Sequence, residues 1–499
     1  MKFHYPTFRV QKTDHLKPDD SRAGDIFSRL GYKLWDAVAD LVDNSVDAGA
    51  TNVLVRFVRS ADGVHSVLIV DNGHGMDSAE LKEAMRFGSK LPKNSKQLGK
   101  YGIGLKSASL SQAEVVTVLS KRAGCYSGRR WTLKNIKAHW KCEVLVERDV
   151  QAVFKGHFGE ITFKPAGTII IWEQLEHLRA LPQNLDKVLE HAIDQLAIEL
   201  GIRFHRFIEA KRLSVSIDQQ FAGESEPLVR RNVTALNPFA YDASGHVDYP
   251  VPLTLKLGTA SVVAHLHVWP PKSRSPGYRL GGGKVALRQG FYFYRNDRVI
   301  QAGGWNGLRA DDGEPHLSLA RVCVDLPAAV DSMFKLDVTK STLDPTPQFH
   351  QALLSAKRGD VTMSRYLDDA QRAYRKQKRK DAARFPYIPG SGLPARARKA
   401  IEAILSEKGT GRTRKVQLRW AVLDPDELVA VDPEGSGIIL NSSFRKRLDE
   451  GRTGDAPALK MALLFLLQDE LAKTFTTKKA SNWLQRVNQA LIAAMKREG

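Results

Sequence analysis

The chain has few cysteines and no long apolar run. Three cysteines occur among 499 residues, and Cys125, Cys142 and Cys323 show no C-x-x-C spacing. This scarcity argues against a disulfide framework or a zinc site, and it favours a reducing cytoplasm with the cysteines as core residues. No stretch approaches the roughly 20 apolar residues that a membrane span needs, and the N-terminus lacks the apolar centre of a signal peptide. We therefore expect a cytoplasmic protein without membrane contact.

Positive charge is what the sequence has in excess. Lys and Arg number 75 against 55 Asp and Glu, which gives a net charge of +20. Part of this charge is clustered in residues 365–385, where the pattern suits a helix with one basic side. A large and clustered positive charge favours contact with nucleic acid, although a charge run is usually a solvated helix face. Hydrophobic residues make up 42%, so a chain of this length should be globular, with two to four domains.

Residues 33–48 form the most informative stretch. On a helical wheel of about 100° per residue, apolar side chains take one side and polar ones crowd into an arc of roughly 100° on the other. That arc holds Asp36, Asp40, Asp43, Asn44 and Asp47. Like charges at these spacings repel each other, and no lysine is mixed among them. The sequence therefore predicts that a bound partner supplies positive charge, and magnesium with phosphate suits such an oxygen-rich face. The alternative is an acidic helix without a ligand.

Two glycine-containing segments follow this helix. Strands are expected at Asn52–Val58 and His65–Val70, because β-rich runs flank an Asp-Gly turn. The second strand leads into DNGHGM (71–76), where an aspartate and two glycines would let a flat ligand approach the backbone. The segment GKYGIGLKSAS (99–109) is a glycine loop that leads into a helix expected at 103–112. The amides of that loop and helix would favour phosphate.

Four segments in this order resemble the ATP site of the GHKL superfamily, and most closely that of MORC-like ATPases. They are ADLVDNSVDAGA (39–50), DNGHGM (71–76), GKYGIGLKSAS (99–109) and GTIIIW (167–172). The resemblance implies an α+β fold: a Bergerat-type ATP-binding α/β sandwich followed by a transducer domain like ribosomal protein S5 domain 2. It also implies ATP and Mg²⁺ as cofactors. A small C-terminal α/β module without a recognisable motif completes the chain.

The resemblance assigns roles to individual residues. Asn44 would ligate magnesium, and Asp71 would accept a hydrogen bond from the adenine amino group. Asp40 stands where the family commonly has the glutamate that positions the attacking water. Aspartate is one methylene shorter, so we expect slow hydrolysis. The implied nucleotide-binding residues are Asn44, Asp71, Gly73, Gly75, Met76, Gly99, Tyr101, Gly102, Ile103, Gly104, Leu105, Lys106 and Thr168. Lys340 would reach the γ-phosphate from the transducer, the alternative being a solvent-facing lysine in a turn.

Composition and resemblance together predict five segments. They are an N-terminal arm (1–22), the ATP-binding domain (23–180), the transducer (181–345), a basic helical segment with a linker (346–394) and a C-terminal module (395–499). The arm is either a tail or a segment that reaches a second protomer. Within the ATP-binding domain, the polar segment 77–98 corresponds to the ATP lid. Further strands are expected at Val115–Leu119, Glu143–Glu147, Glu160–Phe163 and Thr168–Trp172, and a helical pattern covers 185–210.

The functional hypothesis is an ATP-gated homodimer that closes on DNA or another nucleic acid. The alternative is an Hsp90-like ATP-dependent chaperone or scaffold that acts on protein clients. A histidine kinase is disfavoured, because no pair of helices with a phospho-accepting histidine precedes the asparagine helix. The glycines of 281–283 do not make a phosphate loop, because Tyr278 takes the place of the first glycine and Val285 that of the Ser or Thr. A hairpin tip is expected there instead.

Overall fold

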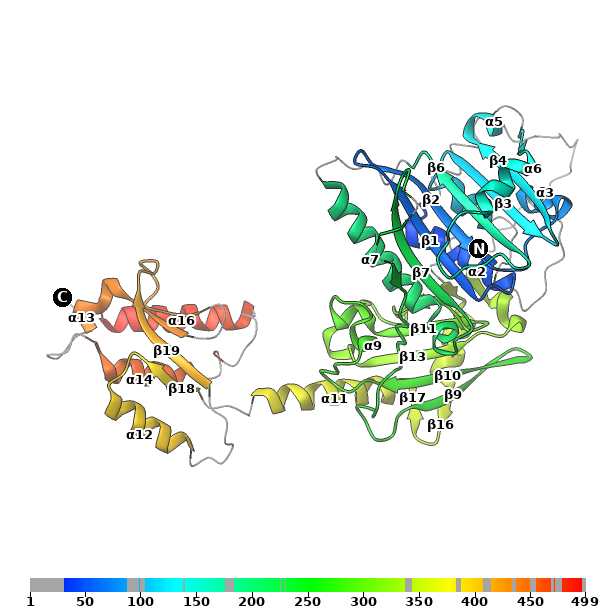
Figure 1. The fold of residues 1–499 in the computed structure, drawn as a ribbon. Coiled ribbons are helices and arrows are strands. Elements are labelled where there is room, and N and C mark those ends of the chain that lie inside the picture. The colour runs from blue at the N-terminus through cyan, green and yellow to red at the C-terminus, as the bar shows by residue number, and fades with distance from the viewer. Residues whose placement is uncertain are drawn as a thin grey trace, which may run out of the picture. The chain divides into compact units, whose positions relative to one another are not determined.

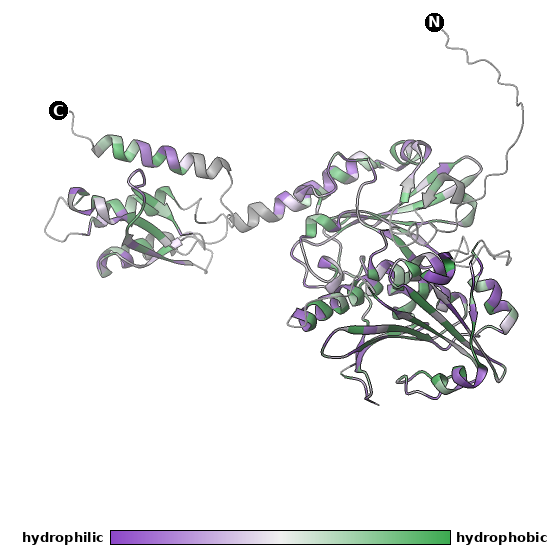
Figure 2. Ribbon diagram, turned by 90° about the horizontal axis from the view of Figure 1, so that it is seen from above, coloured by the Kyte–Doolittle hydropathy of each residue, from purple (hydrophilic) through white to green (hydrophobic). Residues whose placement is uncertain are grey.

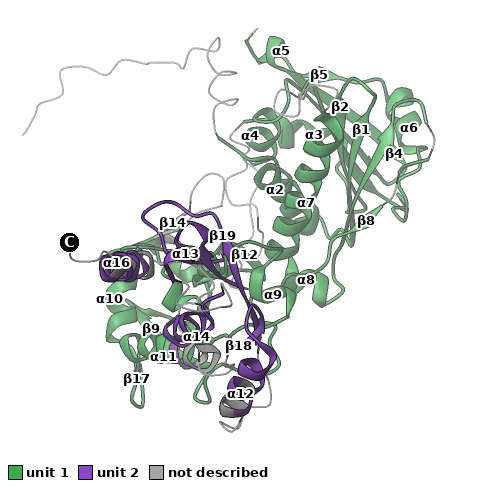
Figure 3. Ribbon diagram, turned by 90° about the vertical axis from the view of Figure 1, so that its left-hand side faces the viewer, with its two compact units in different colours: residues 1–374 green, residues 375–499 purple. Residues whose placement is uncertain are grey.

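The chain divides into two compact units in a computed structural model, Met1–Tyr374 and Arg375–Gly499 (Figure 3). The structure describes residues 31–87, 98, 104–137, 140–175, 184–224, 226–228, 230–336, 343–382, 387–406, 414–432, 437–448, 455–467, 471 and 478–495. The predicted arm, 1–22, lies outside the described residues. The division between the units falls inside the predicted basic segment, and the bounds of the five predicted segments stay predictions. In the described part of the chain, no helix combines the length and the apolarity that a bilayer crossing requires.

An eight-stranded sheet frames the first half of unit 1 (Figure 1). Its order is β5-β4-β3-β6-β2-β1-β7-β8, and β1 pairs in parallel with β7 while the other neighbours are antiparallel. The strands are β1 (Asn52–Arg59), β2 (Val64–Asp71), β3 (Val115–Arg122), β4 (Cys125–Thr132), β5 (Glu143–Val144), β6 (Gly167–Glu173), β7 (Ser214–Phe221) and β8 (Arg231–Asn232).

Both faces of this sheet are covered. Side chains that alternate along a strand point to opposite faces, so Val53 and Val55 of β1 enter one hydrophobic core and Leu54 enters another. The helices that pack into the first core include α2 (Leu34–Asp47), α3 (Ser78–Met85), α4 (Gly104–Leu110) and α7 (Leu185–Arg203). The opposite face is covered by α6 (Glu147–Phe154). Hydrophobic residues concentrate on the strands (Figure 2). The predicted α+β class is confirmed.

A five-stranded sheet forms the second half of unit 1, in the order β12-β11-β13-β10-β9. Its strands are β9 (Val251–Leu257), β10 (Ala260–Val268), β11 (Gly290–Arg295), β12 (Arg298–Ala302) and β13 (Ala320–Asp325). Helices α10 (Pro347–Ser355) and α11 (Met363–Ala382) pack into its main core, and the end of α7 packs with Tyr292 and Tyr294 in a smaller cluster. The smaller elements are α5 (Leu133–Lys137), α8 (His205–Glu209), α9 (Pro276–Arg279), η3 (Val285–Arg288), η4 (Pro315–Leu317), η5 (Ala328–Met333), β14 (Phe334–Leu336), β15 (Leu343–Pro345), β16 (Lys357–Arg358) and β17 (Val361–Thr362). The likeness of this part to an S5 domain 2 transducer stays a prediction.

Unit 2 is a small module with its own core. Its sheet has the order β18-β19-β21-β20, parallel except for the β20–β21 pair. The elements are β18 (Tyr387–Ser391), α12 (Ala395–Ser406), β19 (Arg414–Ala421), β20 (Val429–Val431), β21 (Gly437–Asn441), η6 (Ser442–Phe444), α13 (Arg445–Leu448), α14 (Pro457–Leu466) and α16 (Lys478–Met495). The core combines the strands with residues of α12 and α14.

Some local predictions were wrong. Residues 160–163 form no strand, because Ile161 and Phe163 fold as an irregular segment onto the α6 face of the sheet. The expected strand at 143–147 is only Glu143–Val144, and α6 already begins at Glu147. The glycines of 281–283 join α9 to η3, so they are not the tip of a hairpin. All three have positive φ, a conformation that favours glycine.

Candidate nucleotide site

The acidic face of α2 lies inside the protein. Asp36, Asp40 and Asp43 are all buried. The guanidinium of Arg203, at the end of α7, donates to Asp36, and Arg298 of β12 donates to Asp43 over 2.6 Å. The expectation that a bound partner balances this face was therefore wrong for Asp36 and Asp43. The compensating arginines lie 167 and 255 residues further along the chain, where no helical pattern can reveal them.

Asp40 lies where α2 and α4 meet. Its carboxylate accepts a hydrogen bond of 3.3 Å from the hydroxyl of Tyr32. A Cβ atom built on Gly104 would be 3.4 Å from Oδ2 of Asp40, so the first residue of α4 passes directly beside this carboxylate. Asn44, one turn later on α2, is half-buried. The structure therefore places Asp40 beside the beginning of α4, with Asn44 one turn further along α2, and the roles of both residues stay predictions.

Asp71 ends β2 in a buried position next to this region. The hydroxyl of Ser45 donates to Oδ2 over 3.1 Å, and the N–H of Gly73 donates to Oδ1 over 2.8 Å. Thr168 of β6 lies opposite Asp71 in the sheet register. Burial raises the pKa of Asp71 to about 6, although the hydrogen bonds from Gly73 and Ser45 oppose this shift. Since each carboxylate oxygen can accept more than one bond, Asp71 can also receive an amino group such as that of adenine.

The loop after Asp71 depends on its glycines for packing. Gly75 has φ +64°, and a Cβ there would lie 2.1 Å from the carbonyl oxygen of Lys121 on β3. At Gly73 a Cβ would lie 2.8 Å from the Cβ of Ala48. The next residue, Met76, donates its N–H to Oγ of Ser120 over 2.7 Å. The loop therefore lies close against β3 and the end of α2, a packing reason for these glycines beside the predicted one of room for the base.

We expect Gly75→Ala to destabilise the protein strongly. The substitution combines an unfavourable backbone conformation with a steric overlap against backbone atoms that have no free rotamer. Gly124→Ala is the matched control, because Gly124 has φ +85° and a Cβ placed there would meet nothing within 4 Å. Gly124→Ala should cost about 1 kcal/mol of unfolding free energy, and Gly75→Ala at least about 2 kcal/mol more. Denaturant unfolding measures both, and equal losses would contradict the packing argument.

The rest of the predicted set is described only in part. Gly99, Tyr101, Gly102, Ile103 and Lys340 lie outside the described residues, and their roles stay predictions. Gly104, Leu105 and Lys106 form the first turn of α4. The ammonium of Lys106 is buried and donates to the carbonyl oxygens of Ala84 and Arg86, at the end of α3, over 3.0 and 2.8 Å. The structure thus places Lys106 against the helix that begins the predicted lid, and its phosphate contact stays a prediction.

Magnesium fits this donor set in one specific way. The described residues contain no group of three or more His, Cys, Asp or Glu side chains arranged to hold a metal. Magnesium in nucleotide sites commonly takes one or two protein ligands and fills its shell with phosphate and water. The neutral amide oxygen of Asn44, half-buried one turn from Asp40, suits that arrangement. Asn44 is therefore the residue that would hold the ion.

Sequence reasoning missed four contributors to the site. Ser45 of α2 bonds Asp71, and Tyr32, just before α2, bonds Asp40. Arg203 and Arg298 neutralise Asp36 and Asp43. A serine among mostly apolar helix positions was a weak signal that Ser45 has a polar partner. The sequence near α2 holds no signal for Arg203 or Arg298.

Comparison with known proteins finds a family match in the first part of this chain. Residues 32–168 match the family model described as histidine kinase-, DNA gyrase B-, and HSP90-like ATPase. Protein MICRORCHIDIA 6 of Arabidopsis thaliana is 37% identical over 93 residues, which are 18% of this chain and 14% of that protein. ATPase MORC2 of Homo sapiens is 36% identical over 93 residues, 18% of this chain and 9% of that protein. The crystal structure of the N-terminal domain of a DNA repair protein aligns at 15% identity and a TM-score of 0.42, covering 71% of this chain and 98% of that one.

The family model and the two MORC relatives confirm the resemblance to GHKL and MORC-like ATPases. They are partial, because the aligned segment spans no more than 14% of the length of either curated relative. What those relatives do as whole proteins therefore reaches this chain only as a proposal.

Proposed function

We propose that this chain binds ATP with magnesium, hydrolyses it slowly, and uses the bound nucleotide to close two copies of itself on nucleic acid. The observation that supports ATP binding best is the place of α2: its Asp40 lies beside the first residue of α4, and Ser45, the residue after Asn44, bonds Asp71 at the end of β2. These residues lie inside the segment that matches the ATPase family model.

Each side chain has a distinct task in this proposal. Asp71, held by Ser45 and Gly73, accepts the adenine amino group. Asn44 offers its amide oxygen to magnesium, which would neutralise phosphate charge. Asp40 orients the attacking water, with Tyr32 fixing its carboxylate. The remaining proposed contacts come from four places. The loop after β2 and strand β6 lie on the side of the base, the glycine loop with α4 surrounds the phosphates, and the transducer supplies one lysine. These residues are Gly73, Gly75, Met76 and Thr168, then Gly99, Tyr101, Gly102, Ile103, Gly104, Leu105 and Lys106, and finally Lys340.

Charge supports the nucleic-acid part of the proposal. The chain carries a net charge of +20, and α11 contributes a run of arginine and lysine. Asp369 lies within 3.2 Å of Arg372 and 3.7 Å of Arg365, so acidic neighbours balance part of the run. Arg375 and Lys376 are exposed on the same helix. These two residues are the ones that we expect to contact phosphate.

Duplex DNA binding across salt concentrations, with and without a non-hydrolysable ATP analogue, tests this part. We expect the analogue to tighten binding and to shift the protein to dimers in sedimentation. Replacing Arg375 and Lys376 by Gln should weaken binding to every sequence and reduce the log–log salt slope by about 1.8. The same double change at Lys357 and Arg358, exposed on β16, is the control and should leave the slope nearly unchanged. A salt slope near zero in the unmodified protein would rule out this part of the proposal.

A chaperone or scaffold is the second candidate, favoured by exposed apolar side chains in unit 2. Phe465 and Leu466 of α14 are each about half exposed, and Val422 is 86% exposed. Such surface can bind apolar segments of protein clients. ATPase assays separate the two candidates, because DNA should stimulate turnover under the first and unfolded protein under the second.

A further inference from the structure

A buried ion pair joins the nucleotide helix to the second sheet. Nε of Arg298, the first residue of β12, donates to Oδ1 of Asp43 over 2.6 Å, and the two side chains are 1% and 0% exposed. Asp43 immediately precedes Asn44 and follows Asp40 by three residues. Arg298 therefore contacts, from outside the ATP-binding domain, the turn of helix that carries the proposed metal ligand and the proposed base.

Stabilisation alone explains this pair poorly. Removing two charges from water costs about as much as their attraction returns, so a packed apolar pair of similar volume commonly stabilises a protein as well or better. What a buried guanidinium adds is direction, because its N–H donors are held in one rigid plane; here one of them, Nε, bonds Asp43. Arg298 is itself fixed, since it also donates to the carbonyl oxygen of Val299 over 3.3 Å and lies 5.8 Å from the ring centre of Phe204.

The position of Asp43 on α2 indicates why the orientation of its carboxylate matters. On a helix, Asp43 lies about 60° around the axis from Asp40, on the same polar stripe as Asn44. A carboxylate free to turn along this stripe would compete with Asn44 for a cation, and it would repel the phosphates of a nucleotide at short range. Bonded to Arg298, the same carboxylate is neutralised and turned toward the second sheet.

We propose that Arg298 is a positioning residue of the nucleotide site, a role that rests on the proposed ATP-binding function. It holds Asp43 away from the metal and the phosphates, and it fixes the helical turn that presents Asn44. The second sheet thereby contributes to nucleotide affinity through one side chain that does not contact the nucleotide.

Three variants test this role through ATP affinity and turnover at varied Mg²⁺ concentration. Arg298→Met removes the charge at similar length and takes this counter-charge from the Asp43 carboxylate, so the KM for ATP and the Mg²⁺ requirement should rise about 10- to 100-fold, with a smaller change in kcat. Asp43→Asn/Arg298→Met also removes the carboxylate charge and should recover most of the affinity. Arg298→Lys keeps the charge without the planar fork and should give an intermediate KM.

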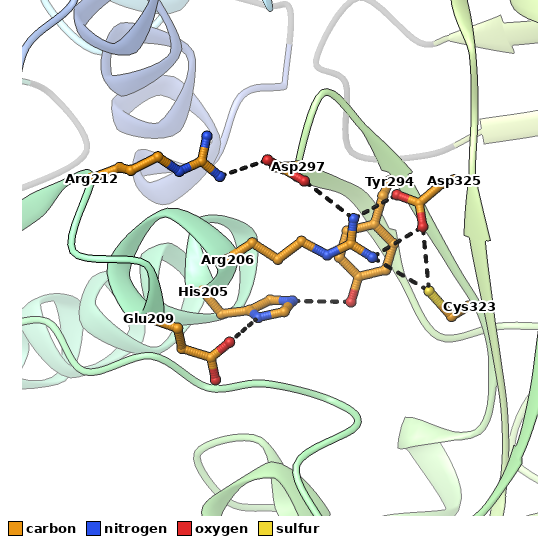
Figure 4. A network of polar contacts seen from close by, with 8 residues as sticks. All are labelled: His205, Arg206, Glu209, Arg212, Tyr294, Asp297, Cys323 and Asp325. Carbon is orange, nitrogen blue, oxygen red and sulfur yellow. Dashed lines mark hydrogen bonds and ion pairs between the residues drawn. The ribbon is translucent and has the colours of Figure 1, made fainter. Parts of the chain in front are cut away.

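Arg212→Met is the matched control. Arg212 donates to Asp297, the residue next to Arg298, over the same 2.6 Å, but the two side chains are 50% and 43% exposed. The contact lies at the exposed end of a network in which Arg206 lies on the ring of Tyr294 and bonds Asp325 (Figure 4). Loss of this exposed pair should leave the KM for ATP unchanged.

The outcomes distinguish the positioning role of Arg298 from the proposed ATP-binding function. Thermal unfolding of each variant shows whether it is folded at the assay temperature. If the unmodified protein binds ATP and folded Arg298→Met and Arg298→Lys bind it equally well, the positioning role is wrong and the proposed function stands. A double variant no better than Arg298→Met would likewise contradict the role of Asp43. If the unmodified protein binds no ATP, the proposed function fails and this role fails with it.

Discussion

Asp71→Asn should lower the affinity for ATP about 100-fold, because the adenine amino group loses a hydrogen bond to an ionised acceptor, and such a bond contributes roughly 1.5–3 kcal/mol. The variant should still fold. An Asn amide nitrogen can take the place of Oδ2, since the hydroxyl of Ser45 can then donate to the carbonyl oxygen of Leu41, already 3.2 Å away. Calorimetry with ATP and Mg²⁺ measures the loss. Asp62→Asn, an exposed change in the β1–β2 turn, is the control, and wild-type affinity in Asp71→Asn would remove Asp71 from the site.

The same substitution should change how stability depends on pH. The folded-state pKa of Asp71 is raised from 3.8 to about 6, so the folded protein holds this proton more tightly than the unfolded chain. The resulting stabilisation is complete below pH 3.8 and is lost as the pH rises through about 6. Relative to Asp71→Asn, the unmodified protein should therefore lose about 2 kcal/mol of unfolding free energy between pH 4 and pH 7. Denaturant unfolding of both proteins at these two pH values measures the difference, and parallel pH curves would contradict the buried, proton-binding carboxyl.

Asp40→Asn should lower ATP turnover at least about 100-fold and leave ATP binding within a few-fold of normal, because a positioned base contributes roughly 10²–10⁴ to rate. Asp40 is buried beside Gly104 and is held by Tyr32, so its carboxylate has a defined direction. Phosphate release at saturating Mg²⁺ and ATP measures turnover, and calorimetry measures binding. Asp149→Asn, on the exposed side of α6, is the control.

Asp40→Glu adds a test of reach. If the short side chain limits hydrolysis, the longer carboxylate should raise turnover above that of the unmodified protein. Full turnover in Asp40→Asn would show that another group positions the water. A loss of both binding and turnover in Asp40→Asn would instead assign Asp40 to the nucleotide contact.

The predictable parts of this protein are those with a local cause. Apolar periodicity predicted α2 within one residue at each end, and alternation with an Asp-Gly turn predicted β1 and β2 within one residue. The strand-terminal position of Asp71 and its glycines also follow from local sequence. Ile161 and Phe163 mislead for the same reason, because two apolar residues separated by one position resemble a strand whether or not a partner strand accepts them.

The unpredictable parts depend on pairing across the fold. The polar stripe of α2 looked like one continuous ligand surface, but Asp36 and Asp43 bond arginines while Asp40 faces α4. Sequence alone cannot show which of these aspartates bonds an arginine and which faces α4, because that depends on which distant side chain the fold brings near. The same limit applies to Ser45, whose partner lies 26 residues away on another element.

The arginine partners of α2 also constrain how the chain can be cut and how it is made. A fragment that stops at residue 180 contains the whole predicted ATP-binding domain but neither Arg203 nor Arg298, so it would bury two aspartates without these counter-charges. During synthesis, the ion pair of α2 with Arg298 can form only after roughly 250 further residues have left the ribosome. The natural folding unit is therefore longer than the segment that family comparison delimits.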